Sequence, residues 1–196
     1  ELTKDIEKKQ KNKDKKLVYL YTSHLEDQHA YIEAAKAKGY TVILLDTPLT
    51  GHFIQKIEQK NSDITFARVD ADTIDKLVEK DEKIPSKLSE KDEEALKPVF
   101  EGVLPKEKFT VEFESMSESD NPITITQPEF MRRMNDMNKI GGGGGMFMGS
   151  MPEMYKMVVN SNHPLISTIL NEKKDNKKTG IGETSHRPGY AFAKYA

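Results

Sequence analysis

The chain has 196 residues, of which 32% are charged and 36% hydrophobic, and its formal net charge at pH 7 is only −2. Because acidic and basic side chains nearly cancel, the composition gives no reason to expect a nucleic acid or a membrane as a partner. The absence of cysteine excludes disulfides and thiolate chemistry and fits a reducing compartment. No apolar run is long enough to span a bilayer, and no signal-peptide pattern follows Glu1. Since the first residue is not methionine, we expect a piece of a longer protein.

Residues 1–16 are almost wholly charged or amidic. Such a stretch is typical of a solvated linker, or of the end of a helix whose partner lies elsewhere. We assign it no function.

Strands and helices alternate in the following part of the chain. Short apolar runs predict strands at residues 17–21, 40–45 and 64–69, and helical spacing of apolar residues predicts helices between them, near 24–38, 50–57 and 74–78. Ser23 is a plausible cap of the first helix, and Gly39 closes it. The pattern predicts a small α/β layer of αβα type with a mostly parallel sheet.

A layer of this kind often binds a ligand at its strand ends, but no glycine fingerprint or phosphate loop follows the first strand. Asp46 ends the second strand, and His24 follows the first. An aspartate in an Asp-Thr-Pro turn is also explained by turn chemistry alone. A small α/β ligand-binding or hydrolytic domain using Asp46 and His24 stays open as the alternative function.

A charged turn at residues 81–86, which contains Pro85, marks a predicted domain boundary. A helix is expected from Ser89, with Asp92 completing a capping box and Pro98 kinking the helix. Strands are predicted at residues 109–113, 123–126 and 155–159, the second returning antiparallel to the first. A helix follows from Pro164, with His163 as a capping or turn residue rather than a catalytic one. This half is predicted to be an α+β domain with a three-stranded sheet and helices on one face.

All nine methionines lie between Met116 and Met157. A predicted helix at residues 128–140 carries apolar side chains at helical spacing and ends at the five glycines 141–145. Methionine is flexible and polarisable, so a cluster of it forms a surface that can adapt to many partners. Ordinary core packing and a homo-oligomer interface are the alternatives. The predicted client-binding residues are Phe130, Met131, Met134, Met137, Met146, Phe147, Met148, Met151 and Met154.

Four segments together resemble the C-terminal part of a heat-shock protein 90 family chaperone of the bacterial HtpG type. Residues 17–46, with Ala-Lys-Ala-Lys-Gly-Tyr-Thr-Val-Ile-Leu-Leu-Asp, are similar to the α/β layer that closes the family's middle domain. Residues 94–104, with Leu-Lys-Pro, resemble the start of its C-terminal domain. Residues 119–123 and the run Met-Val-Val-Asn-Ser-Asn-His-Pro-Leu-Ile at 157–166 resemble that domain's sheet and the turn after it.

The resemblance covers about residues 17–173 and implies three parts. Residues 1–83 correspond to the end of the middle domain, residues 84–178 to a truncated C-terminal dimerisation domain, and residues 179–196 to an atypical tail. The methionine segment falls where the family carries an amphipathic segment implicated in client contact.

The family resemblance further implies an ATP-dependent, cytoplasmic stress-response chaperone that forms a homodimer and binds unfolded or partly folded client proteins. ATP and Mg²⁺ belong to the full-length protein. For this chain we expect no catalytic residue, no cofactor site and no metal site, and hence no enzyme activity of its own. The family's two long apolar dimerisation helices have no counterpart after Leu170.

Overall fold

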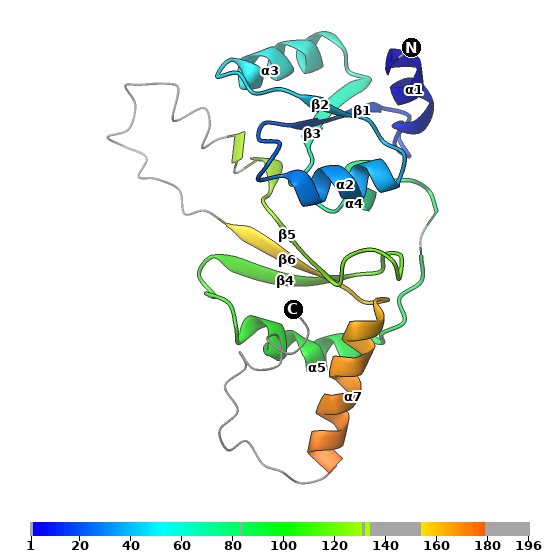
Figure 1. Cartoon of the computed structure of the whole chain (residues 1–196), viewed down its shortest axis with the longest axis vertical. Helices are drawn as coiled ribbons and strands as arrows, with labels where there is room; N and C mark the ends of the chain where they lie inside the picture. The colour runs from blue at the N-terminus through cyan, green and yellow to red at the C-terminus, as the bar shows by residue number, and fades with distance from the viewer. Residues whose placement is uncertain (1, 83, 131, 134–153, 179–196) are drawn as a thin grey trace, which may run out of the picture. The chain divides into compact units, whose positions relative to one another are not determined.

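The computed structural model describes residues 2–82, 84–130, 132–133 and 154–178. The chain folds into two compact units, one comprising residues 1–82 and 126–153 and the other residues 83–125 and 154–196. Mixed α/β architecture is therefore confirmed, with a three-stranded sheet in each unit (Figure 1). The assignment of the two halves to chaperone domains stays a prediction.

The first unit is built around a fully parallel sheet of order β2-β1-β3. Its helices and strands are α1 (Leu2–Lys9), β1 (Leu17–Thr22), α2 (His29–Ala37), β2 (Val42–Leu44), α3 (Thr50–Lys60), β3 (Ile64–Arg68) and α4 (Ile74–Leu77). Parallel pairing follows because each strand is linked to the next by a helix. The predicted parallel sheet is thus confirmed.

Helices cover both faces of this sheet, with α2 and α4 on one face and α3 on the other (Figure 1). Val18 and Leu20 of β1 point to the first face and pack with Ile32 of α2. Tyr21 of β1 and Phe66 of β3 point to the opposite face and pack with Ile54 of α3. Alternate residues of each strand are therefore buried on opposite sides, as the apolar strand compositions predict.

The N-terminal stretch is not a solvated linker, so the first of the two interpretations of its sequence is wrong. Helix α1 contacts β1, and Ile6 is only 3% exposed. Gln10, 1% exposed, donates from Nε2 to the Val18 carbonyl at 2.9 Å and accepts from the Thr41 amide at 2.6 Å. Its side chain therefore bridges β1 to the residue before β2. The charge-rich composition concealed these two buried positions.

The first predicted helix begins later than expected. Ser23 does not cap it; α2 starts at His29, after Gln28, whose Oε1 accepts from the Ser23 amide at 3.0 Å and from the Thr22 hydroxyl at 2.6 Å. Gly39 does end the helix in the left-handed conformation, with φ of 73°. The buried side chain of Gln28 thus accepts hydrogen bonds in the turn before α2, where a serine cap was expected.

The second unit has a sheet of order β4-β6-β5 with α5 and α7 on one face (Figure 1). Its elements are α5 (Glu90–Glu101), β4 (Phe109–Glu114), β5 (Ile123–Thr126), β6 (Tyr155–Asn160) and α7 (Pro164–Lys178). Leu96 and Phe100 of α5 pack against Ile166 of α7 and Val159 of β6. The predicted three strands and the capping box of Ser89 and Asp92 are confirmed. Helix α5 continues through Pro98.

The predicted pairing of the first two strands of this sheet is wrong. β6 lies between β4 and β5 and pairs with β4 in parallel, from Phe109 opposite Tyr155 to Glu114 opposite Asn160. Within this sheet β6 is the most buried strand, and Val158 and Val159 are both 0% exposed. The apolar run Met157–Val159 takes the centre of this sheet, where neighbouring strands cover both of its edges.

Candidate functional site

Most of the predicted client-binding residues, Met131, Met134, Met137, Met146, Phe147, Met148 and Met151, lie outside the described residues. Phe130 and Met154 are described. Phe130 is 71% exposed, and Met154, directly before β6, is half-buried. They belong to different compact units. The described site is therefore the start of the segment, around Phe130.

The expected helix does begin after Pro128. Glu129, Phe130, Arg132 and Arg133 are helical, and the Arg132 amide donates to the Pro128 carbonyl at 3.2 Å. Proline fits this position because its fixed φ suits the first turn and the missing N–H has no helical partner there. The side chains on this turn face two ways: Phe130 is exposed, whereas Arg132 is only 7% exposed.

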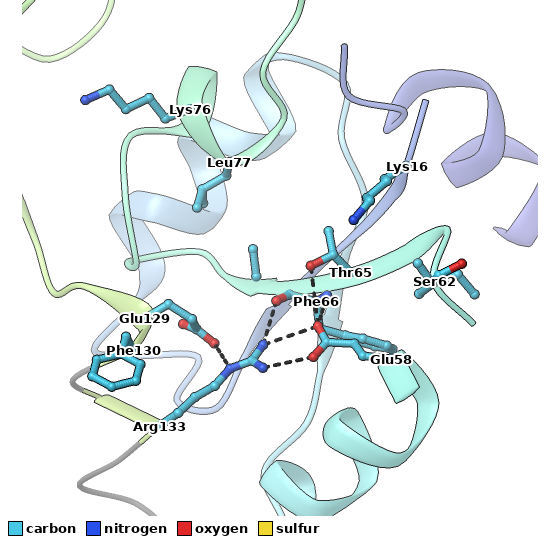
Figure 2. Close-up of a pocket in the computed structure, with 12 residues that line it drawn as sticks. Lys16, Glu58, Ser62, Thr65, Phe66, Lys76, Leu77, Glu129, Phe130 and Arg133 are labelled. Carbon is cyan, nitrogen blue, oxygen red and sulfur yellow. Dashed lines mark hydrogen bonds and ion pairs between the residues drawn. The ribbon is translucent and has the colours of Figure 1, made fainter. Parts of the chain in front are cut away.

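Arg133 fastens this turn to the α/β layer (Figure 2). Its Nε donates to Glu129 Oε1 at 2.6 Å, its Nη1 to Glu58 Oε2 of α3 at 2.9 Å, and its Nη2 to the Phe66 carbonyl of β3 at 2.9 Å. Burial lowers the pKa of Arg133, but hydrogen bonds to Glu58 and Glu129 outweigh that effect, so the pKa is raised. The guanidinium therefore stays charged and joins its own turn to α3 and β3, whose contacting residues lie 75 and 67 residues away.

Arg132 and Glu129 form a second anchor on Tyr21 of β1. Arg132 Nη2 donates to Glu129 Oε1 at 2.6 Å and also to the Tyr21 hydroxyl, and its guanidinium lies 5.7 Å from the Tyr21 ring centre. Burial raises the pKa of Tyr21 to about 12, with Glu129 adding to the rise. Burial would raise the pKa of Glu129 too, but Arg132 and Arg133 lower it overall. The anchor therefore holds a neutral phenol and an ionised carboxylate.

An open cavity of about 670 Å³ lies beside the ion pairs that Arg133 makes with Glu58 and Glu129 (Figure 2). Glu58, Phe66, Glu129 and Arg133 line it on the side of the anchor. Phe130 lines it as well, so the exposed ring adjoins a hollow in the surface. The lining of the cavity combines apolar side chains with charged groups, of which Glu58 and Glu129 are paired with Arg133.

Sequence reasoning missed the anchor. The spacing of Glu129 to Arg132 and Arg133, three and four residues, is the signal that could have revealed the ion pairs on the turn itself. Tyr21 and Glu58 carry no such signal, because only the fold brings β1 and α3 to this turn.

The residues of the alternative function, Asp46 and His24, follow adjacent strand ends, since Thr22 of β1 pairs with Leu44 of β2. Both are exposed. Neither lines the 670 Å³ cavity, which lies along β3. Their placement at one sheet edge follows from parallel topology alone and adds no observation in favour of catalysis.

The Asn-Ser-Asn-His-Pro turn after β6 has a structural role. Asn162, 3% exposed, donates to the carbonyls of Met116 at 2.9 Å and Pro85 at 3.1 Å and accepts from the Lys87 amide at 2.8 Å. His163 Nδ1 accepts from the Leu165 amide at 3.1 Å at the start of α7, which confirms the capping interpretation. The motif thus ties the entry of α5 to the end of β6.

Within the described ranges, no cluster of three or more histidines and carboxylates is arranged to hold a metal ion. Across the same residues, none of the helices combines the length and the apolar character that a membrane crossing needs.

No protein-family model matches the chain. Curated relatives do, and they are molecular chaperones. The chain is 42% identical over 172 residues to chaperone protein HtpG of Bacteroides fragilis strain 638R, a match that covers 86% of this chain and 25% of the relative. It is 39% identical over 181 residues to HtpG of Porphyromonas gingivalis (91% and 26%) and 40% identical over 172 residues to HtpG of Bacteroides thetaiotaomicron (86% and 25%).

The resemblance indicated by the sequence motifs is confirmed: over most of its length the chain is similar to a part of the HtpG chaperones. It spans about a quarter of the length of the curated relatives it matches.

Proposed function

We propose that this chain is the client-contacting and dimer-positioning part of an ATP-dependent chaperone. It binds unfolded or partly folded proteins through the methionine surface, which we define as the nine predicted client-binding residues from Phe130 to Met154 given above. ATP and Mg²⁺ act in parts of the full-length protein outside this chain, the protein works as a homodimer, and its compartment is the cytoplasm. The similarity to HtpG supports this role.

The observation that carries the proposal at residue level is the exposure of Phe130. A phenyl ring that is 71% exposed leaves most of its apolar surface in water. Burial of such surface contributes roughly 25 cal/mol per Å², so one ring gives weak binding and several side chains acting together give useful affinity. The two arginine anchors hold the turn that bears the ring, and this lowers the ordering cost of binding.

The experiment is to measure the affinity of the chain for a permanently unfolded model protein, with Phe130→Ser as the variant. Leu25→Ser is the matched control, because Leu25 is also exposed, at 53%, but lies in the loop after β1. We expect Phe130→Ser to weaken binding several-fold while Leu25→Ser leaves it unchanged. Equal binding by both variants and the native chain would contradict the role of Phe130.

A further inference from the structure

The outer edge of β3 is closed by two side chains instead of a further strand. β3 is the last strand in the order β2-β1-β3, and among the described residues it pairs with β1 alone. The Phe66 amide donates to Glu58 Oε1 at 2.8 Å, and the Phe66 carbonyl accepts from Arg133 Nη2 at 2.9 Å. A carboxylate and a guanidinium therefore stand where the carbonyl and amide of a neighbouring strand would stand. We call Glu58 and Arg133 the edge cap.

The edge cap can open without the sheet coming apart. Its members are side chains, from α3 and from the turn after Pro128, and no backbone pairing of β3 depends on them. Arg133 is 31% exposed and Glu58 23%, so water reaches the ion pair and weakens it. Just after β3, by contrast, the contact is between backbone groups: the Gln127 amide donates to the Asp70 carbonyl at 3.0 Å.

Space for an occupant lies directly beside the cap. The 670 Å³ cavity runs along β3, with polar lining residues beside an apolar set formed by Ile64, Phe66, Ala67, Leu77 and the exposed Phe130. Leu77, Phe66 and Phe130 are seen in Figure 2. The apolar set accepts apolar side chains. When the edge cap opens next to this cavity, the Phe66 amide requires a new acceptor and the Phe66 carbonyl a new donor.

We propose that this edge is a docking site for one extended apolar segment of an unfolded polypeptide, which adds beside β3 as a fourth strand when the edge cap opens. An extended backbone supplies both a carbonyl and an amide to Phe66, whereas a helical partner has its own backbone groups already paired. The proposal rests on the chaperone function above, but it uses β3 and backbone hydrogen bonds, and of the methionine surface it uses Phe130 alone.

The test uses a short fluorescent peptide rich in valine and threonine, and the same peptide N-methylated at alternate residues so that it cannot pair as a strand. Binding to the native chain is compared with Arg133→Ala and Glu58→Ala, which open the cap from either side. Lys56→Ala is the control, because it removes a charge from an exposed position of α3 without touching β3.

We expect both cap variants to bind the unmethylated peptide roughly tenfold more tightly, since a larger fraction of the chain is then competent to bind. Lys56→Ala should match the native chain, and the methylated peptide should gain nothing. No gain in either cap variant, or an equal gain for the methylated peptide, would overturn the proposal.

A second readout keeps the proposal falsifiable if a cap variant fails to fold. In the native chain, saturating unmethylated peptide should shift the amide NMR signals of Ile64, Phe66 and Arg68 along β3. Unchanged signals would overturn the inference. Serine variants of the methionines, with Phe130 kept, separate the two ideas. They weaken binding of an unfolded protein only if the proposed function holds, whereas Arg133→Ala and Glu58→Ala tighten binding of the unmethylated peptide only if this inference holds.

Discussion

Asn162 illustrates how one buried amide can fix several backbone segments. Its donors and acceptor are all used, by the carbonyls of Met116 and Pro85 and by the Lys87 amide. Sequence motifs marked this position as family-like but gave no reason for it. The reason is long-range: the partners lie 46, 77 and 75 residues away, so no local pattern can predict them.

We expect Asn162→Ala to destabilise the second unit by about 2 kcal/mol or more, because it leaves buried backbone groups without partners. Urea unfolding followed by circular dichroism measures the change. Asn121→Ala, at an exposed position in the β4–β5 connection, should change the unfolding free energy by less than about 0.5 kcal/mol. Similar values for both substitutions would show that the network is not needed.

Glu129 gives a pH-dependent prediction for the first unit. Because its pKa is lowered in the fold, its contribution is present above the unfolded value of 4.5 and is lost as pH falls through the folded value. We expect Glu129→Gln to lower the free energy of unfolding by about 2 kcal/mol at pH 7, since it breaks a largely buried ion pair. The difference from the native chain should shrink below pH 4.5, where the native carboxylate is also neutralised. A difference that is constant with pH would contradict this account.

At the level of elements, apolar spacing predicted nearly every strand and helix, because burial on one or both faces leaves a period of its own in the sequence. It did not predict the neighbours of β4, because strand order depends on which strand is buried at the sheet centre. The signal for the central strand was the pair Val158 and Val159, two consecutive apolar residues that are both fully buried in the structure. Helix α1 was only one of two alternatives, because its two apolar residues, Leu2 and Ile6, stand among charged ones and make too short a pattern to decide.

Helix α7 should depend on the residues that face α5 and β6. Ile166 is 0% exposed and packs in the core of the second unit, whereas Thr168 is exposed. We expect Ile166→Ala to cost about 3 kcal/mol through the cavity that it leaves, and Thr168→Ala to cost less than about 0.5 kcal/mol. Thermal unfolding of the two variants checks the ratio. Equal losses would show that α7 does not pack as described.

For the whole molecule, two compact units predict two independent responses to substitution. Glu129→Gln should speed hydrogen exchange in β1 and β3 but not in β6, and Asn162→Ala should do the reverse. The double variant should show the sum of the two free-energy changes within about 0.5 kcal/mol, because the sites share no partner. Faster exchange in both sheets after either single substitution would contradict this independence.

At this scale the sequence predicted the family and the α/β content. The methionine surface stays a prediction, and the structure describes two of its residues, Phe130 and Met154. The anchors beneath Phe130 could not be predicted, because Tyr21 and Glu58 meet Arg132 and Arg133 only after the first unit has folded. The charged anchors fix the turn that bears Phe130.

The most direct test of the central claim is the affinity of the chain for a permanently unfolded model protein, measured for the native sequence and for a variant with serine at Met131, Met134, Met137, Met151 and Met154. Circular dichroism and urea unfolding establish that the variant keeps the native fold. The proposed function predicts that the folded variant loses most of its binding. Equal binding by the two chains, with the fold intact, would contradict it and leave the methionines as core or interface residues.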